Sequence, residues 1–538
     1  MKTELLTFLV LASLGYRCQA TDYFSSISGL EQLLHTEHTL MSELSSQLDA
    51  TRNTLKQLES EVTAIKLEHA MAAKGLENYL TNPINIYRLM KRLHTDWQQM
   101  ERRVQQMSTQ IRFNITQHYG LNFPSQEDVD GAALALVRLQ STYKLDVAQV
   151  AAGILNGIKY GTDMSWQDCF VLGQQLFEME DYNNTKVWLR ESMERLRRHQ
   201  QPQHQDHSAP EPTILNSMEM VAKSLFQMGD FDTAYELSQR VLELDPSRIR
   251  NWHLSAKAAN VVQGEIGEVA QSRHADGGYR LTQEFAHYEK VCRGEVSASA
   301  AQQRPLRCRY ARGQHAYRVL APLKLEEHSL DPLVVSYHDM LSPQQIIELR
   351  QMAVPHMKRS TVNPLPGRQS KKSAFRVSKN AWLEYDTHPM MGRMLRDLSD
   401  ATGLDMTYCE QLQVANYGVG GHYEPHWDFF VDSQHYPAEE GNRIATAIFY
   451  LSDVEQGGAT AFPFLNFAVR PQLGNILFWY NLHRSLDMDY RTKHAGCPVL
   501  KGSKWIANIW IHEATQTFAR PCDVIRDNEV SLGYDIIE

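Results

Sequence analysis

The stretch Pro425-His426-Trp427-Asp428 decides the fold of the C-terminal half, together with Lys493-His494-Ala495-Gly496-Cys497 further along. In an extended segment, residues i and i+2 face the same side, so His426 and Asp428 can converge on one ion. His494 is a candidate third ligand. Two imidazoles and one carboxylate leave positions open, as non-haem iron(II) requires, whereas a structural zinc site is closed and usually richer in Cys. Because the chain has 22 His, the His-x-Asp pair is a weak signal until its neighbours are considered.

The neighbouring segments predict a sheet-rich domain. Arg443–Leu451 is typical of a buried strand, Gly457-Gly458 of a turn, and Gly474–Tyr480 and Cys497–Trp510 of further strands. Short apolar strands separated by glycine turns favour a jelly roll of two sheets, with the ligands held between them.

Lys504 is a cation within an apolar strand, beside Trp505 and Ile506. An unpaired buried charge is costly, so this ammonium needs an anion or water. One interpretation is that it reaches solvent along its flexible stem. The other is a salt bridge to the far carboxylate of 2-oxoglutarate.

These residues carry a family resemblance. The run Gln413-Val-Ala-Asn-Tyr-Gly-Val-Gly-Gly-His-Tyr-Glu-Pro-His-Trp-Asp-Phe429, followed by Gly441–Thr446, Gly457–Pro463, His494–Leu500 and Lys504-Trp505, resembles the catalytic domain of collagen prolyl 4-hydroxylase alpha subunits. The likeness extends over nearly the whole chain. It implies a multidomain α plus β protein, with an N-terminal helical or coiled-coil domain, a tetratricopeptide-like helical domain and a C-terminal double-stranded β-helix (jelly roll) dioxygenase domain.

Carried over position by position, the resemblance implies a complete cofactor site. His426, Asp428 and His494 would hold Fe(II), and Lys504 would bind the C5 carboxylate of 2-oxoglutarate. Tyr417 and Thr460 would help to hold that carboxylate, and Trp510 would line the site. Each of these three has a plainer alternative: Tyr417 packs beside Gly418, Thr460 is an ordinary strand residue, and Trp510 belongs to the core.

The reaction that the resemblance implies is hydroxylation of proline at C4, coupled to oxidative decarboxylation of 2-oxoglutarate to succinate with O2. L-Ascorbate would restore iron oxidised in uncoupled cycles. Three alternatives stay open: the same chemistry on other proline-rich secreted proteins, on lysine, or a non-catalytic subunit whose helical domains bind a peptide. Other histidines of the domain are expected at the surface or behind the ligands: His422, His435, His483 and His512.

The length, net charge and termini of the chain limit its domain count, its ligands and its location. A chain of 538 residues should form three or four domains. A net charge of -9 gives no support for nucleic-acid binding. Residues 1–20 resemble a signal peptide, the alternative being a buried N-terminal helix, and no later apolar run is long enough for a membrane span. A soluble protein of the endoplasmic reticulum lumen is therefore expected.

Retention in that compartment would need a partner, because Tyr534–Glu538 lacks a KDEL-type signal. The resemblance implies the protein disulfide isomerase beta subunit, in an α2β2 tetramer. It also implies two disulfides, Cys292 with Cys308 and Cys497 with Cys522, and leaves Cys169 and Cys409 open. Sequons at Asn114 and Asn183 are possible glycosylation sites.

The expected organisation is a signal peptide at 1–20, a helical dimerisation domain at 21–150, a tetratricopeptide-like peptide-substrate-binding domain at 151–261, a linker at 262–330, the dioxygenase domain at 331–520 and a tail at 521–538. The first helical region has a heptad seam broken at Thr51, formed by Met41, Leu44, Leu48, Leu55, Leu58, Val62 and Ile65. This seam is a dimer contact or an amphipathic face folded onto its own domain.

The second helical region has small residues at tetratricopeptide-like positions: Ala222, Gly229 and Ala234. By resemblance its groove binds extended proline-rich chains with tyrosines. This chain instead has Lys223 and Phe226 where collagen enzymes tend to carry Tyr. Residues 197–212 predict a flexible loop, whose His199, His204 and His207 are weak metal candidates, and Ser342-Pro-Gln-Gln345 predicts a helix start with a capping box.

Overall fold

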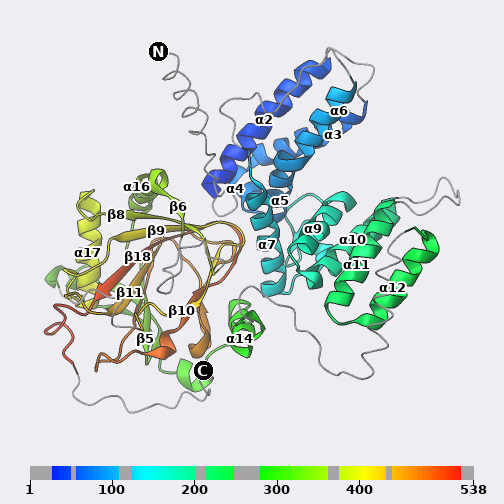
Figure 1. The fold of residues 1–538 in the computed structure, drawn as a ribbon. Helices are drawn as coiled ribbons and strands as arrows, with labels where there is room; N and C mark the ends of the chain where they lie inside the picture. Colours follow the sequence, from blue (N-terminus) through cyan, green and yellow to red (C-terminus); the bar gives the residue numbers. More distant parts are fainter. Residues whose placement is uncertain are drawn as a thin grey trace, which may run out of the picture.

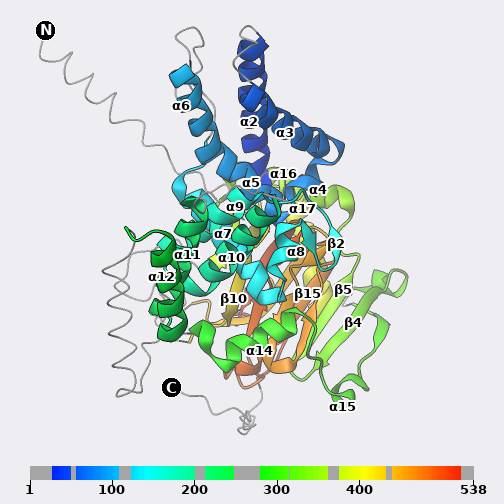
Figure 2. The ribbon, with the colours of Figure 1, turned by 90° about the vertical axis from the view of Figure 1, so that its right-hand side faces the viewer.

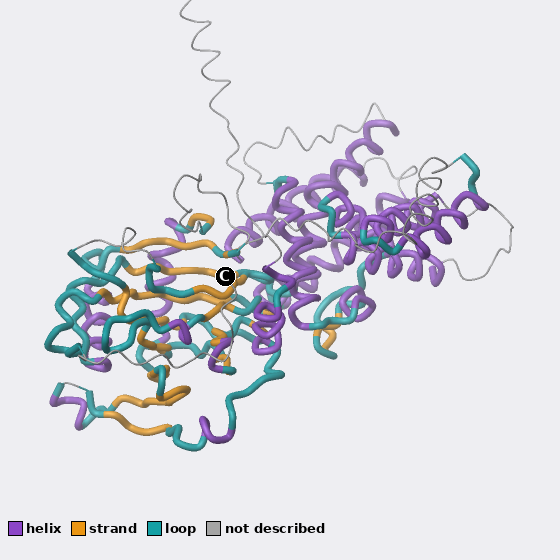
Figure 3. The backbone as a smooth tube through the Cα atoms, turned by 60° about the horizontal axis from the view of Figure 1, so that its bottom comes forward, coloured by secondary structure: helices purple, strands orange, loops and turns teal. Residues whose placement is uncertain are grey.

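The computed structural model describes residues 27–49, 56–107, 123–199, 212–247, 279–313, 315–360, 375–431 and 439–522. A helical region and a sheet-rich region lie side by side (Figures 1 and 3). This arrangement confirms the expected α plus β class.

The N-terminal helices pack around a shared apolar core. They are α2 (Ile27–Asp49), α3 (Lys56–Lys74), α4 (Leu76–Leu80), α5 (Pro83–Lys91), α6 (Trp97–Met107) and α7 (Gln126–Tyr143). The described side chains of the heptad seam are buried within one chain, because α2 contacts α3 and α5: Met41, Leu44, Leu58, Val62 and Ile65. The seam therefore serves the protein's own core at these positions, and its use in a dimer stays a prediction.

A buried ion cluster joins three of these helices. Arg92 donates to both carboxylate oxygens of Glu37 and, at 2.6 Å, to Glu68. The Tyr79 hydroxyl also donates to Glu68, at 2.6 Å. Although burial opposes ionisation, Arg92 lowers the pKa of Glu37 to about 2. Glu37 is thus an ionised carboxylate in an apolar core, and it depends on Arg92.

The second helical unit contains α9 (Trp166–Glu178), α10 (Tyr182–His199), α11 (Pro212–Gln227) and α12 (Phe231–Leu244). A Cβ on Gly173 would lie 2.6 Å from Leu189, so glycine lets α9 and α10 approach closely. Between the units lie α8 (Val147–Ala151) and the strands β1 (Ile154–Leu155) and β2 (Ile158–Lys159). One apolar cluster continues from Leu30 to Trp188, so the packing has no gap at the predicted boundary near residue 150.

Two antiparallel sheets form the C-terminal region. The nine-stranded sheet has the order β3-β4-β5-β15-β11-β18-β9-β8-β6, and the five-stranded sheet has the order β14-β13-β16-β10-β7. Helices α16 (Pro343–Ala353) and α17 (Pro389–Thr402) pack on one face of the large sheet. A second apolar cluster, with Tyr417, Phe462 and Trp479, fills the space between the sheets.

The strands of the large sheet, in chain order, are β3 (Cys308–Ala311), β4 (Leu323–Leu330), β5 (Leu333–His338), β6 (Lys358–Arg359), β8 (Lys379–Leu383), β9 (Leu412–Tyr417), β11 (Arg443–Tyr450), β15 (Ile476–Tyr480) and β18 (Lys504–His512). Those of the small sheet are β7 (Arg376–Val377), β10 (His422–His426), β13 (Thr460–Phe462), β14 (Phe467–Val469) and β16 (His494–Gly496). A separate pair consists of β12 (Gln456–Gly457) and β17 (Val499–Lys501).

Two sequence predictions about this region are wrong. The expected single strand Cys497–Trp510 divides into β17 and β18, because the chain turns at Gly502, whose φ is +103°. The expected linker 262–330 holds α14 (Gln283–Cys292), α15 (Ala300–Gln303), β3 and β4 within its described part. Its strands join the large sheet through β5. The predicted helix at Ser342 is confirmed, capping box included.

The expected disulfide pairs are also wrong. Cys292 is bonded to Cys497, with their Cα atoms 5.7 Å apart. The pairing follows from the position of α14, which contacts β13 and β14 and so places Cys292 beside the segment after β16. Cys308 and Cys522 are exposed thiols, and Cys169 and Cys409 are also unbonded.

Some predictions fall outside the described residues: the signal peptide, the sequon at Asn114, His204 and His207, and the end of the tail. Asn183 is exposed near the start of α10. Within the described ranges, no helix combines the length and apolar content needed to cross a membrane.

Removing Arg92 should destabilise the helical region strongly. Arg92→Met removes the cation that Glu37 and Glu68 share and leaves them only His69 at 2.6 Å and Arg88 at 3.5 Å, which should lower the free energy of unfolding by about 3 kcal/mol. Arg103→Met is the matched control, since the Arg103–Glu61 pair is about 40% exposed and should contribute less than about 1 kcal/mol. Urea unfolding followed by circular dichroism measures both, and equal losses would contradict the assignment.

The same cluster gives a pH dependence. Glu37 has a pKa below its ordinary 4.5, so its contribution to stability is present above pH 4.5 and is lost as the pH falls through about 2. The free energies of unfolding of the parent and of Arg92→Met, measured by urea unfolding at several pH values, should therefore differ most above pH 4.5.

Non-reducing peptide mapping should find Cys292 linked to Cys497, with Cys308 and Cys522 alkylated as free thiols. A linked peptide containing Cys292 and Cys308 would contradict this pairing.

Candidate functional site

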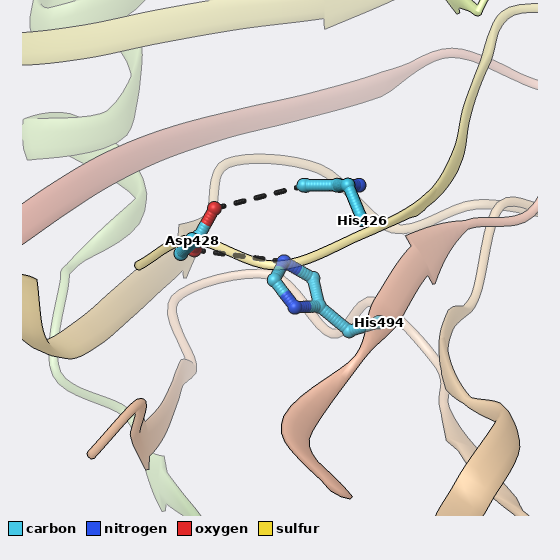
Figure 4. A group of neighbouring side chains, drawn as sticks. All are labelled: His426, Asp428 and His494. Carbon is cyan, nitrogen blue, oxygen red and sulfur yellow. Dashed lines mark ion pairs between the residues drawn. The ribbon is translucent and has the colours of Figure 1, made fainter. Parts of the chain in front are cut away.

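Three side chains meet between the two sheets (Figure 4). Nε2 of His426 lies 3.7 Å from Oδ1 of Asp428, and Nε2 of His494 lies 3.5 Å from Oδ2 of the same carboxylate. The three ligand atoms all lie within 4.8 Å of one another. Among the described residues, this is the one group of three or more His, Cys, Asp or Glu with such geometry.

The strand pairing brings the two imidazoles together. His426 and His494 are direct partners across the antiparallel strands β10 and β16. Asp428 lies two residues beyond the end of β10. The sequence predicted that it shares a regular strand with His426, and this part of the prediction is wrong. Its position is instead fixed by hydrogen bonds from β11.

Hydrogen bonds orient each candidate ligand. Nδ1 of His426 lies 2.7 Å from the Glu424 carbonyl, and Nδ1 of His494 lies 3.1 Å from the Thr492 carbonyl. Since a carbonyl only accepts, each Nδ1 carries the proton and each Nε2 keeps a free lone pair. The Thr446 hydroxyl donates to Oδ2 of Asp428 at 2.8 Å, and Asn481 donates to Thr446.

Burial sets the charges of this group. It lowers the pKa of His426 to about 3, and it lowers the pKa of His494 too. The two imidazoles keep the pKa of Asp428 below its ordinary value against the effect of burial. At neutral pH the site offers two neutral imidazoles and one carboxylate, which is the form that binds a divalent cation.

Lys504 lies on β18 and faces the same space. It pairs across strands with Tyr417, and its Nζ donates to the Thr460 hydroxyl at 3.3 Å. The Tyr450 hydroxyl lies 2.8 Å from that same Thr460 oxygen. Lys504 is 3% exposed and burial lowers its pKa to about 7. No carboxylate among the described residues pairs with it, so this buried ammonium calls for an anionic ligand.

Trp510 lies further along β18, opposite Thr446 on β11. The Arg443 guanidinium stacks 4.4 Å from its ring, and the buried indole nitrogen has no hydrogen-bond partner among the described residues. Arg443 also donates to the Asp428 carbonyl at 3.2 Å. Trp510 therefore borders the site, rather than packing in the apolar core.

The arrangement fits iron(II) and 2-oxoglutarate. Two nitrogens and one oxygen on one side of an ion leave other positions open for a chelating ligand and O2. The space between the sheets also holds a buried cation without an anion, which suits the far carboxylate of such a ligand. All seven residues singled out in the sequence lie between or beside the two sheets.

Sequence reasoning missed several contributors. Thr446 and Asn481 position Asp428, Tyr450 positions Thr460, and the Tyr423 ring stacks on His426 with centroids 3.6 Å apart. Thr446 was detectable as a polar residue inside an apolar strand. Tyr450 gave no such signal, because aromatic residues are common in strands.

The other histidines were expected at the surface or behind the ligands. His422 and His512 are buried, which excludes the surface for both, and neither belongs to the metal cluster. His512 lies within hydrogen-bond distance of the Gly441 carbonyl and of Glu410. His483 lies 3.7 Å from Asp489 and also stays outside the cluster, and His435 is outside the described residues.

Three family profiles match the chain. The prolyl 4-hydroxylase alpha-subunit N-terminal region matches residues 26–157, and the prolyl 4-hydroxylase peptide-substrate-binding domain matches residues 166–255. The 2OG-Fe(II) oxygenase superfamily matches residues 412–512, which include all seven site residues.

Similar proteins cover nearly the whole chain. Prolyl 4-hydroxylase subunit alpha-1 of Homo sapiens is 36% identical over 93% of this chain and 95% of its own length. Subunit alpha-2 of Gallus gallus is 36% identical over 96% and 98%, and subunit alpha-2 of Caenorhabditis elegans is 34% identical over 99% and 98%.

Among solved structures, the viral collagen prolyl hydroxylase of Paramecium Bursaria Chlorella virus-1, in complex with 2OG, is 26% identical. It covers 33% of this chain and 95% of its own, with a TM-score of 0.27. The relatives aligned over almost their full length decide the classification: this chain belongs to the prolyl 4-hydroxylase alpha-subunit family and is an iron(II)- and 2-oxoglutarate-dependent dioxygenase.

Proposed function

We propose that this protein is the catalytic alpha subunit of a procollagen-proline 4-dioxygenase, which hydroxylates C4 of proline in collagen-like or other proline-rich secreted chains. The observation that carries the proposal is the convergence of His426, Asp428 and His494 in the same inter-sheet space as the buried Lys504. A non-catalytic peptide-binding subunit would have no use for an ammonium kept in an apolar space beside three metal-binding groups.

His426, Asp428 and His494 would bind the iron. Iron(II), when bound with 2-oxoglutarate, activates O2 for the coupled decarboxylation and hydroxylation. The protein's own contribution is to supply two unprotonated Nε2 atoms and a carboxylate held by Thr446. Close packing between the sheets keeps bulk water away from these groups.

Lys504 would form a salt bridge with the C5 carboxylate of 2-oxoglutarate. Thr460 and Tyr417 would complete this end of the site, the first through its hydroxyl and the second from the neighbouring strand β9. Trp510 would line the side nearer Asp428. A buried salt bridge of this kind replaces the water that the carboxylate loses on binding.

The tetratricopeptide-like unit would hold the substrate, since it matches a peptide-substrate-binding domain. In this unit Lys223 is paired with Glu219 at 2.6 Å, and Phe226 packs edge-on against Phe231 with ring centroids 5.0 Å apart. Phe226 keeps an aromatic face for proline rings, whereas Lys223 does not. We therefore propose that the substrate is a proline-rich chain, and the peptide array below determines which sequence repeat it carries.

The relatives are subunits, and this chain would also act within an assembly. Protein disulfide isomerase would be the beta subunit of an α2β2 tetramer in the endoplasmic reticulum lumen. L-Ascorbate would restore iron oxidised in cycles without peptide.

Peptide-dependent turnover tests the function. The protein, co-expressed with protein disulfide isomerase, should form 4-hydroxyproline on proline-rich peptides with one succinate released for each hydroxylation. Asp428→Ala should abolish both the turnover and the iron content, because it opens the metal site. Asp453→Ala, which changes an exposed carboxylate of the same domain, should keep the parent activity.

A peptide array distinguishes the substrates. Turnover of Pro-Pro-Gly repeats supports the collagen assignment, and turnover confined to other proline-rich peptides moves the substrate class while keeping the chemistry. Binding of iron and 2-oxoglutarate without hydroxylation of any peptide in the array would refute the proposed prolyl activity.

Lys504 should control 2-oxoglutarate binding. Lys504→Ala removes one partner of a buried ion pair, which costs about 2 kcal/mol or more and should raise the KM for 2-oxoglutarate at least about 30-fold. Lys324→Ala is the control, because Lys324 is exposed and pairs with the exposed Asp339. An unchanged KM in Lys504→Ala would refute the role of Lys504.

Lys504 also predicts proton uptake. Its pKa of about 7 lies below the ordinary 10.5, so at pH 8 the empty site is mostly unprotonated, and a bound carboxylate should restore the proton. Calorimetry at pH 8 in buffers of different ionisation enthalpy should show a fraction of a proton taken up that approaches one. Lys504→Ala should show none of this uptake.

A further inference from the structure

Helix α7 of the N-terminal region lies beside the sheet-rich domain (Figures 1 and 2). Ala135, Arg138 and Thr142 are spaced by three and four residues, so they share one face of this helix. Ala135 and Arg138 contact Gly420 of the sheet-rich domain, and the Thr142 carbonyl accepts a hydrogen bond from Arg293, the residue after α14. Tyr143, at the end of the helix, adds a fourth contact.

Arg138 holds the turn before β10. Its guanidinium donates to the Gly420 carbonyl at 3.0 Å. Gly420 has a φ of +73°, and a Cβ there would lie 2.5 Å from the Cβ of Ala135, so glycine lets α7 approach this backbone. The turn is also bonded to the segment after β16, because Gly420 N–H donates to Val499 and Val499 N–H donates to Gly421.

Tyr143 holds the segment after β16. Its hydroxyl donates to the Pro498 carbonyl, which also accepts the Gly458 N–H at 3.1 Å. A Cβ on Gly457 would lie 2.7 Å from the Tyr143 hydroxyl oxygen, so this second approach also requires glycine. One phenol therefore contacts two chain segments of the sheet-rich domain.

The segments that α7 holds are those that carry the site. Gly420 lies between Tyr417 and His426, Pro498 lies between His494 and Lys504, and Gly458 lies two residues before Thr460. The apolar contacts agree, since Val419 and Leu500 belong to the core of the helical region rather than to a core of the sheets. The positions of two candidate ligands, and of Lys504 and Thr460, are thus tied to one helix.

The electrostatic environment of Arg138 also supports a role for this residue at the interface. Burial and the neighbouring cation Arg280 lower the pKa of Arg138 to about 9. Its Nε has no hydrogen-bond partner among the described residues. The protein thus keeps a buried guanidinium at this interface against an electrostatic cost, with the Gly420 carbonyl as its bonded partner.

We propose that Arg138 and Tyr143 of α7 are positioning residues for the dioxygenase site: through the Gly420 and Pro498 carbonyls they hold the segments that carry His426, His494, Lys504 and Thr460. The proposal rests on the proposed roles of those four residues. It makes the N-terminal helical region a part of the catalytic unit, in addition to any role in assembly.

Tyr143→Phe and Arg138→Met test the proposal in the full-length protein. Tyr143→Phe removes one hydroxyl and keeps the ring, so it should fold as the parent does. Each variant should raise the KM for 2-oxoglutarate about tenfold, as loss of supporting hydrogen bonds does at metal sites. The visible absorption band of the anaerobic iron(II)–2-oxoglutarate complex should shift or weaken, while the KM for peptide and the melting temperature stay close to the parent values.

Two further variants complete the design. Arg138→Lys should recover most of the 2-oxoglutarate affinity, since an ammonium can donate one hydrogen bond to Gly420. Ser141→Ala is the matched control on the same helix, because Ser141 makes only a 3.5 Å contact with Glu289. It should match the parent in every measurement.

The proposal would be overturned if both Tyr143→Phe and Arg138→Met kept the parent KM for 2-oxoglutarate and the parent absorption band. It would also be overturned if the KM and the band changed only in variants whose melting temperature is lower. The absorption band is recorded without peptide or O2. It therefore reports on positioning by α7 even where no peptide is hydroxylated, which separates failure of this proposal from failure of the prolyl activity.

Discussion

The pairing of His426 with His494 across β10 and β16 is the constraint on which the site depends. Because side chains alternate along a strand, a shift of this pair by one residue would turn one imidazole to the opposite face of the small sheet. The register is secured outside the pair as well. The disulfide from α14 ends at Cys497, one residue beyond β16, and α7 binds the turn that precedes β10.

The charges of the site balance in a simple way. With neutral imidazoles, the formal charges of Asp428 and a protonated Lys504 sum to zero, and so do those of iron(II) and the 2-oxoglutarate dianion. Filling the site while Lys504 is protonated therefore adds no net charge to the space between the sheets, whereas filling it while Lys504 is neutral adds the one proton that Lys504 takes up. It pairs each existing charge with its opposite, the carboxylate with the cation and the ammonium with the far end of the cosubstrate.

The sequence predicted the residues of the candidate site better than it predicted the linker and the disulfide. Lys504 was detectable because a charged side chain in an apolar strand needs a partner, and the ligand residues were detectable from the His-x-Asp spacing and the family resemblance. The linker was misjudged because β4 reads Leu-Lys-Leu-Glu-Glu-His-Ser-Leu, a strand with little apolar alternation. The Cys292–Cys497 bond could not be predicted, since it depends on the place where α14 docks. His422 and His512 are buried by tertiary packing that no local pattern encodes.

The order of strands in the large sheet has a consequence for how the chain is made. β18, the last strand of the described residues, lies inside the sheet between β11 and β9. Until it emerges from the ribosome, β9 and β8 have no bonded connection to β11 and β15, and the two halves present open edges. Such a sheet is dominated by contacts distant in sequence, which form slowly. Completion of this sheet therefore waits for β18, and the interval before it is when the nascent chain most needs protection from aggregation.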